Sequence, residues 1–492
     1  MSGTLERPFD LVIGGAETPG ARAEHAPVKN PASNADLAHV AIGHADDARH
    51  AMEVAQSAFD SSWWAADDGG RRAKALLKLG GLLETRLEEF AQLETLNMGK
   101  TLKESRGDMG FVVRTIEYVA GLADKVQGET IPVPGARLDY TVREPLGVTV
   151  HIAPWNYPLL LAIRGVAPAL AGGNAAVLKP ASLTPLTAIA FGRLAKDAGI
   201  PDGILNVVVG SGGEVGETLV NDARCRSVTF TGSGDVGRRI AELAARRTIP
   251  ATLELGGKSP VVVFPDADLD RAARGIAFGI FGNAGQMCWA GSRLIVHASV
   301  HQALVERVGK IANATRLGPG MEAESEMGPL VSPEHLEKVA GYVESARSEG
   351  GKVVVGGSRV AEAPLEAGNF YRPTVVDDAP PTAKAVREEI FGPVLVVHPF
   401  ETTDEAIRIA NTTDFGLFAA IWTKDLATAH TAAKRLEAGM VSVNEAPVTF
   451  PQTPFGGYKG SGLGFEQGAD VVRAYTRRKN VVVNLSVPKA KG

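Results

Sequence analysis

The chain has 492 residues, 45% of them hydrophobic and 22% charged, with a formal net charge of −5. These values predict a globular protein of two or three domains, and the near balance of charge gives no reason to expect a nucleic-acid partner. Two cysteines are too few for a disulfide framework or a cysteine-rich metal site, so we expect no metal and a reducing, cytoplasmic location. The first residues lack the apolar core of a signal peptide. Arg164 and Pro168 interrupt the most apolar long stretch, so we expect no membrane span.

The front of the chain is predicted to be helical. Residues 46–62 and 71–104 carry apolar side chains at helical spacing, as amphipathic helices do. Residues 128–148 differ, because prolines and glycines surround an alternating segment there. This pattern predicts a hairpin that leaves the main body.

Strand and helix patterns then alternate along the chain. The predicted strands of this region span 148–154, 174–180, 204–210, 227–232 and 251–257. Such alternation predicts a parallel sheet with helices on its faces and a ligand site at the carboxyl ends of the strands. A second α/β set is expected over 261–460.

The segment 476–486 reads as a short apolar strand near the C-terminus without a sequence-adjacent partner. An unpaired strand is a liability unless it adds to a sheet. We therefore expect it to be lent to another subunit, beside the hairpin of 128–148.

A glycine pattern points to a nucleotide. Residues 232–237, GSGDVG, follow a predicted strand and precede a helix, which is where a dinucleotide fingerprint places phosphate. On that interpretation Glu254 binds the ribose. Three predicted strands precede this motif, however, and the glycine-rich turn 210–216 competes for the same role, so the assignment of Glu254 stays open, as does a tight turn that serves packing alone.

Seven motifs in order carry a family resemblance. They are APWNYP (153–158), LKPAS (178–182), FTGSGDVG (230–237), LELGGKSP (253–260), GNAGQMCWAGSR (282–293), EEIFGPV (388–394) and PFGGYKGSG (454–462). With these motifs the chain resembles the aldehyde dehydrogenase superfamily from end to end. The resemblance implies an α/β fold with three parts: a Rossmann-like cofactor domain (1–127 and 147–257), a catalytic α/β domain (258–460) and a small β oligomerisation domain (128–146 and 461–492). It also implies a homodimer or homotetramer.

The resemblance assigns the chemistry to three residues. Cys288 becomes the nucleophile that attacks an aldehyde, since a thiolate both attacks and leaves well. Asn156 and the backbone N–H of Cys288 become the oxyanion donors. Glu254 becomes the base that activates water to hydrolyse the thioester, and Glu466 an acid that relays protons. Cys225 remains a buried, inert thiol.

The same resemblance implies an NAD or NADP site. Glu389 takes the ribose contact and Phe391 lies near the nicotinamide. The other expected cofactor residues are Ala153, Pro154, Trp155, Lys179, Ser182, Gly212, Gly216, Thr231, Gly232, Ser233, Gly237 and Leu255. Many NAD-preferring relatives have Glu where this chain has Ser182, and a short hydroxyl leaves room for a 2′-phosphate. We therefore expect NADP to be used, with NAD preference through other contacts as the alternative.

The substrate stays open between two classes. Tyr157 and Arg164 share a helix face, and Arg164 matches the arginine that binds the carboxylate of succinate semialdehyde in relatives. Its alternative is a pair with a local acid. Tyr157, Trp289 and Phe450 can instead line a tunnel for an aromatic or aliphatic aldehyde, although relatives place their loop aromatic at the position of Thr449. Two other functions compete with oxidation to a free acid: CoA-acylating oxidation, and a binding or structural protein without chemistry. The set Cys288, Glu254 and Asn156 argues against both.

Overall fold

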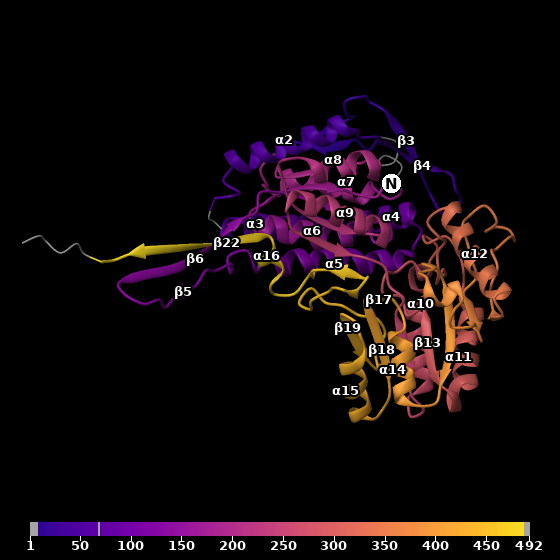
Figure 1. Cartoon of the computed structure of the whole chain (residues 1–492). Helices are drawn as coiled ribbons and strands as arrows, with labels where there is room; N and C mark the ends of the chain where they lie inside the picture. The colour runs from indigo at the N-terminus through magenta and orange to yellow at the C-terminus, as the bar shows by residue number, and fades with distance from the viewer. Residues whose placement is uncertain (1–7, 67–68, 487–492) are drawn as a thin grey trace, which may run out of the picture.

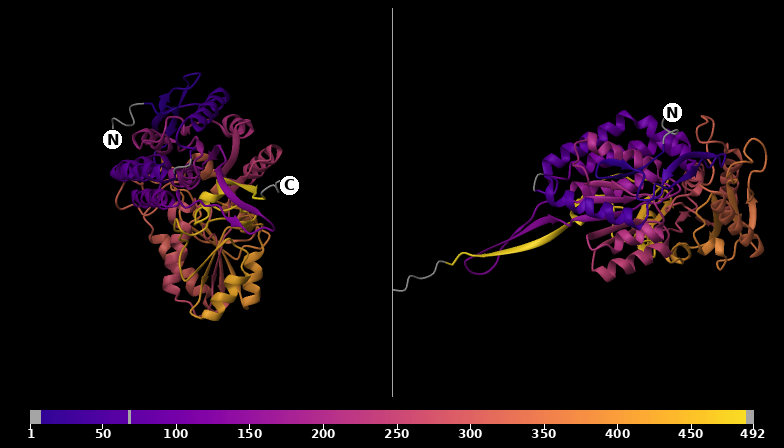
Figure 2. Two further views of the ribbon diagram at one scale, coloured as in Figure 1. Left: turned by 90° about the vertical axis from the view of Figure 1, so that its left-hand side faces the viewer. Right: turned by 90° about the horizontal axis from the view of Figure 1, so that it is seen from above.

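The computed structural model describes residues 8–66 and 69–486, and it arranges them as two α/β units and a projecting arm (Figure 1). The two units lie side by side, and the arm points away from both (Figure 2). No helix within the described residues is long and apolar enough to cross a membrane. The α/β class predicted from the sequence is confirmed.

The first unit is built on an eight-stranded sheet with the order β2-β1-β9-β8-β7-β10-β11-β21. In that order the strands span Ala16–Thr18, Leu11–Ile13, Leu205–Val207, Ala175–Lys179, Val148–Ile152, Cys225–Thr231, Ala251–Glu254 and Gly462–Leu463. The five central strands, β9 to β11, run parallel, and β8 is buried along its whole length. Full burial is expected where helices cover both faces of a parallel sheet.

Helices cover the two faces of this sheet in separate groups (Figure 1). On one face α6 and α7 (Pro158–Ala171 and Leu186–Asp197) pack beneath α3, α4 and α5 (Gly69–Thr85, Leu87–Met98 and Leu102–Ala120). The other face carries α2, α8 and α9 (Ala45–Ser61, Glu217–Asn221 and Gly234–Arg247). The front of the chain is helical as predicted, but a short hairpin of β3 and β4 (His25–Lys29 and Asp36–Ala41) precedes its first helix.

The second unit holds a seven-stranded sheet with the order β14-β15-β16-β13-β12-β18-β19. In that order the strands span Lys352–Val355, Thr374–Asp377, Val394–Phe400, Arg293–His297, Pro260–Val263, Phe418–Trp422 and Met440–Val443. Its helices are α10 (Leu269–Phe281), α11 (His301–Ala314), α12 (Pro333–Ser348), α13 (Lys384–Arg387), α14 (Thr403–Asn411) and α15 (Leu426–Arg435). Two strands of the C-terminal region, β17 and β20 (Phe415–Gly416 and Tyr458–Lys459), pair outside this sheet.

The arm is a three-stranded sheet of β5, β6 and β22 (Thr130–Ile131, Arg137–Pro145 and Thr476–Asn484). The hairpin expected at 128–148 forms, and β22 pairs with β6 of its own chain from Thr476↔Pro145 to Asn484↔Arg137. The segment 476–486 therefore lies beside the hairpin as expected, but the expectation that it pairs with a strand of another subunit is wrong for its pairing with β6. The short helix α16 (Val471–Ala474) leads into β22 from the body. Tyr475 fixes the root of the arm, since its hydroxyl lies 2.7 Å from the Thr229 hydroxyl.

Candidate active site

The site lies where the parallel strands of the first sheet end. Ile152 pairs with Lys179 at the ends of β7 and β8, and Thr231 pairs with Glu254 at the ends of β10 and β11. Four of the seven motifs singled out in the sequence, those at 153–158, 178–182, 230–237 and 253–260, lie at the ends of these strands. The carboxyl edge of the sheet therefore gathers them, as the topology predicts.

Cys288 sits on a tight loop after α10. Asn283 and Ala284 in this loop have φ of 46° and 52°, a left-handed conformation that non-glycine residues rarely adopt. Gln286 holds the loop, because its side-chain amide donates to the Asn283 carbonyl at 2.9 Å and its Oε1 accepts from the Val331 N–H at 2.9 Å. The small residues around the thiol serve this close packing: a Cβ on Gly285 would lie 2.1 Å from the Gly392 carbonyl oxygen.

The Cys288 thiol is partly exposed, although its surroundings desolvate it strongly. Burial raises its pKa to about 12, against the attraction of the Arg164 charge. The thiol is therefore protonated at neutral pH in this state, and attack on a carbonyl needs a group that takes its proton.

Asn156 and Glu254 lie beside this thiol, and both are buried. The Asn156 side-chain amide donates to the Gln286 carbonyl at 2.9 Å, which fixes its orientation and leaves its second N–H free to donate. Neither carboxylate oxygen of Glu254 has a hydrogen-bond partner within the described residues. Burial and the charge of Glu466 raise the pKa of Glu254 well above its usual value, against the attraction of Arg164.

Two cavities meet at Cys288. The first has about 700 Å³ of empty space, and its walls mix polar side chains with apolar ones, with a larger polar share than the second cavity has. Its walls include the predicted residues Pro154, Trp155, Asn156, Thr231, Gly232, Ser233, Glu254, Leu255, Cys288, Glu389 and Phe391. We call it the polar cavity.

The second cavity has about 900 Å³ of empty space and mostly apolar walls. Of the predicted substrate residues, Tyr157, Arg164 and Trp289 line it together with Cys288. We call it the apolar cavity. Phe450 is 54% exposed and is not among the residues that line it, whereas its neighbour Thr449 is.

Arg164 is not a free carboxylate clamp. Its Nε lies 2.9 Å from Oε2 of Glu466, and both side chains are almost fully buried. Its guanidinium carbon also stacks 3.7 Å from the ring centroid of Phe455. Of the two alternatives left open by the sequence, the structure favours the pair with a local acid.

In the polar cavity Glu389 is tied to the strand-end loop of Glu254. Its Oε1 accepts from the Gly257 N–H at 2.9 Å, and burial raises its pKa to about 7. Phe391 has a φ of 61° and packs edge-on against Trp155, with 5.2 Å between ring centroids.

Six predicted cofactor residues lie outside the walls of the polar cavity. They are Ala153, Lys179, Ser182, Gly212, Gly216 and Gly237. Lys179 is buried, burial lowers its pKa to about 8, and a Cβ on Gly216 would lie 3.6 Å from its side chain. The Ser182 hydroxyl donates to the Gly210 carbonyl at 3.0 Å. Gly237 serves helix–strand packing, since a Cβ there would lie 2.4 Å from the Leu255 side chain.

Sequence reasoning missed four polar-cavity residues: Leu161, Gly256 and the polar pair His335 and Lys338. Both lie in the first half of α12, one turn apart, so they share a helix face. The His335 imidazole lies 2.7 Å from the Phe391 carbonyl oxygen and 5.2 Å, centroid to centroid, from the Trp155 ring. The only signal in the sequence was this i, i+3 spacing, which is common on any helix.

The comparisons with known proteins agree with this architecture. The sequence profile of the aldehyde dehydrogenase family matches residues 18–481. The chain is 42% identical over 457 residues to betaine aldehyde dehydrogenase of Bacillus subtilis (strain 168), covering 92% of this chain and 93% of that one. It is 40% identical over 481 residues to hydroxyisobutyraldehyde dehydrogenase of Mycolicibacterium austroafricanum, covering 98% and 95%. The solved NAD+ complex of an aldehyde dehydrogenase from Bacillus cereus superposes with a TM-score of 0.96 at 41% identity, covering 99% of this chain and 98% of that one. The chain therefore belongs to the aldehyde dehydrogenase family and is an oxidoreductase.

Proposed function

We propose that this protein oxidises an aldehyde to its carboxylic acid, with NAD+ as the hydride acceptor and water as the second reactant. The observation that carries the proposal is the position of Cys288, which belongs to the walls of both cavities. Of the two residues that the walls share, Leu161 and Cys288, only the thiol can act chemically on an aldehyde that meets a nicotinamide there. On this proposal the first unit (1–127 and 147–257) binds the cofactor and the second (258–460) supplies the nucleophile.

The polar cavity fits a dinucleotide. Ser233 is the N-cap of α9 but makes no side-chain cap hydrogen bond, so the first N–H groups of that helix remain available to a pyrophosphate. Glu389 offers carboxylate oxygens to ribose hydroxyls. The NAD+ bound by the Bacillus cereus relative supports the same ligand here. When bound, NAD+ supplies a two-electron acceptor that takes hydride from the carbon attached to Cys288.

The protein's own residues carry the covalent steps. The Cys288 thiol gives up its proton to solvent as its sulfur forms a bond to the aldehyde carbon, and the carbonyl electrons move to the oxygen. The free N–H of the Asn156 amide and the backbone N–H of Cys288 stabilise that oxyanion, each by about 3 kcal/mol in the transition state. Loss of hydride leaves a thioester on Cys288.

Glu254 completes the reaction. Its unpaired carboxylate takes a proton from water, the hydroxide adds to the thioester, and the thiolate leaves as the carboxylic acid forms. The charge of Glu466 acts on Glu254, and Glu466 itself forms an ion pair with Arg164. On this proposal Glu466 relays the proton away from Glu254.

The test is an aldehyde panel followed by NADH absorbance, with and without CoA, and with isotopically labelled water. We expect NADH without CoA, and one labelled oxygen in the acid. A requirement for CoA would favour an acylating dehydrogenase, and no NADH with any aldehyde would favour a binding or structural role.

The arm supports an oligomer. Within the described residues β22 has no strand on its outer edge, and an open edge of this length is a template for another chain. We propose a homodimer or homotetramer that uses the arm, which light scattering coupled to size-exclusion chromatography tests. Because the chemistry needs Cys288 as a free thiol, we also propose a reducing compartment, the cytoplasm.

A further inference from the structure

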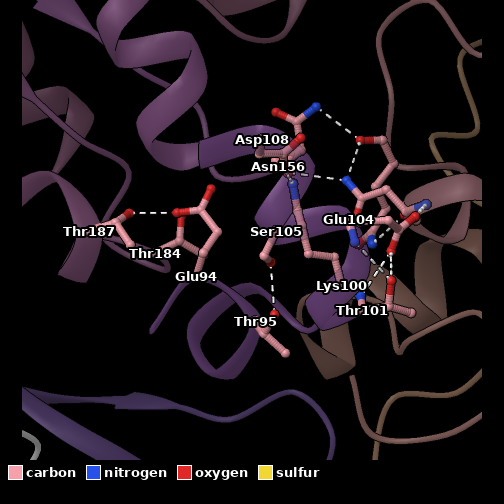
Figure 3. Close-up of polar contacts among 12 residues, drawn as sticks. Glu94, Thr95, Lys100, Thr101, Glu104, Ser105, Asp108, Asn156, Thr184 and Thr187 are labelled. Atoms are coloured by element: carbon pink, nitrogen blue, oxygen red, sulfur yellow. Dashed lines mark hydrogen bonds and ion pairs between the residues drawn. The ribbon is translucent and has the colours of Figure 1, made fainter. Parts of the chain in front are cut away.

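The charged side chains that line the apolar cavity form ion pairs within the protein, with the exception of Arg114. Among the described residues that line the cavity, Asp108 is the only one with a carboxylate. Its Oδ2 lies 2.6 Å from Nζ of the fully buried Lys100 (Figure 3). Arg164 is paired with Glu466. The cavity therefore offers no uncompensated negative charge to a cationic substrate.

Two of its aromatic rings also hold cations of the protein itself. Lys100 Nζ lies 3.6 Å from the ring centroid of Tyr157, and the guanidinium carbon of Arg164 lies 3.7 Å from that of Phe455. A quaternary ammonium is recognised by the negative face of such rings. A cation already on one face weakens the ring as a partner for a second and repels it. Tyr157 and Phe455 are thus poorly suited to form an aromatic cage.

The mouth of the cavity has the same character. Phe278 and Val448 line it and are 64% and 45% exposed, so the rim is apolar. Arg114 also lines it, is exposed, and makes no ion pair with any described residue. The unpaired charge at the cavity is therefore positive.

We propose that the apolar cavity accepts aldehydes with an uncharged, apolar body and rejects aldehydes that carry a quaternary ammonium group. This inference rests on the proposed function, because the cavity is the aldehyde side of Cys288. On this inference the chain differs in substrate from relatives named for betaine aldehyde, a quaternary ammonium compound. Overall sequence identity to those relatives does not reveal the difference. The apolar walls exclude water from the substrate body, and burying a cation there without a counter-charge is unfavourable.

A pair of isosteric substrates tests the proposal on the wild-type protein. 5,5-Dimethylhexanal and 4-(trimethylammonio)butanal have the same shape and differ in the charge of one atom. We expect kcat/KM, normalised to the unhydrated aldehyde, to be at least about 100-fold higher for the neutral compound. Equal values, or a preference for the cation, would overturn the inference and leave the dehydrogenase function intact. Oxidation of neither compound, nor of any aldehyde in the panel, would instead overturn the proposed function.

Two variants locate the cause. Arg114→Gln removes the exposed charge, and we expect the neutral-to-cation ratio of kcat/KM to fall by about threefold. Lys100→Met frees the Tyr157 face and the Asp108 carboxylate, and we expect the ratio to fall by at least about tenfold. Lys103→Gln changes an exposed charge on α5, the helix that also carries Arg114. It is the matched control and should leave the ratio unchanged. A ratio that none of these variants moves would contradict the electrostatic account, and if Lys100→Met does not fold, the wild-type ratio and Arg114→Gln decide.

Discussion

The two cavities that meet at Cys288 differ in how they recognise a ligand. The polar cavity is built from strand ends, the N-terminus of α9 and two residues of α12, so both units contribute hydrogen-bonding groups to it. The apolar cavity is lined by α5, α6, α10 and the loop that contains Thr449, and its charged side chains other than Arg114 are paired within the protein. One thiol can therefore face two unlike ligands, because directional contacts hold one and an apolar shape holds the other.

The largest effect should come from the thiol at the junction. Cys288→Ala should lower kcat by at least about 10⁴-fold, because the bond to the aldehyde carbon cannot form. Cys225→Ala is the matched control and should keep kcat within about twofold, since such buried thiols act as small apolar side chains. Burial raises the pKa of both thiols to about 12, so position between the cavities, not acidity, distinguishes them. Equal losses of kcat in the two variants would show that position between the two cavities does not distinguish Cys288 from Cys225.

The next effect concerns Glu254, the proposed base in the wall of the polar cavity. Glu254→Gln should lower the steady-state rate about 10²- to 10⁴-fold while one equivalent of NADH per site still appears in a rapid burst. The burst survives because hydride transfer precedes hydrolysis. Stopped-flow absorbance measures both phases.

The pH profile of the wild type supplies the control for Glu254. Burial and Glu466 raise its pKa, so the active carboxylate form grows as pH rises, and the rate should climb on the alkaline side. The same raised pKa favours the folded state at low pH, and that stabilisation is lost as pH rises. Glu254→Gln should lose this limb of the rate profile. A burst that disappears with the steady state would assign Glu254 to an earlier step.

A smaller pair of effects tests whether the cavities act independently. Glu389→Gln should raise KM for NAD+ by about tenfold, since hydrogen bonds to a charged group contribute about 1.5–3 kcal/mol, and should leave KM for the aldehyde within twofold. Trp289→Ala should do the reverse, because it removes apolar wall from the substrate side. If each variant moved both KM values together, the two cavities would have to be treated as one site.

The sequence predicted well where on the fold the site lies, and it did so for a physical reason. The carboxyl ends of parallel strands meet at one edge of the sheet, so the alternation of strand and helix predicted a ligand site there, while the roles of Asn156 and Glu254 in it came from the family resemblance. The loop of Cys288 was readable because only small residues permit such close backbone approach. The α/β class followed from the same alternation of strand and helix.

Other features depend on contacts that no local pattern encodes. The pairing of Arg164 with Glu466, and of Lys100 with Asp108, joins residues whose charges alone do not say which partner they take. Phe450 is exposed and is not among the residues that line the cavity, whereas its neighbour Thr449 is, and in an irregular loop no local pattern tells which of two adjacent residues lines a wall. The strand β22 lies beside the hairpin of 128–148 as expected, but it pairs with β6 of its own chain, and no local pattern tells whether a partner strand belongs to the same chain.

The last prediction concerns cofactor choice, at Ser182 and Lys179, which lie outside the walls of the polar cavity. We propose that NADP+ is used alongside NAD+, since the short Ser182 side chain turns to the Gly210 carbonyl and Gly212 and Gly213 leave open space around that loop. Ser182→Glu should lower the NADP+-to-NAD+ ratio of kcat/KM by at least about tenfold through repulsion of the 2′-phosphate, while Ser182→Ala should leave the ratio within about twofold. Because burial lowers the pKa of Lys179 to about 8, its positive charge is lost as pH rises past that value, and the wild-type ratio should fall over the same range. A wild-type preference for NAD+ of a thousandfold would show that other contacts exclude the phosphate and that Ser182 only fills space.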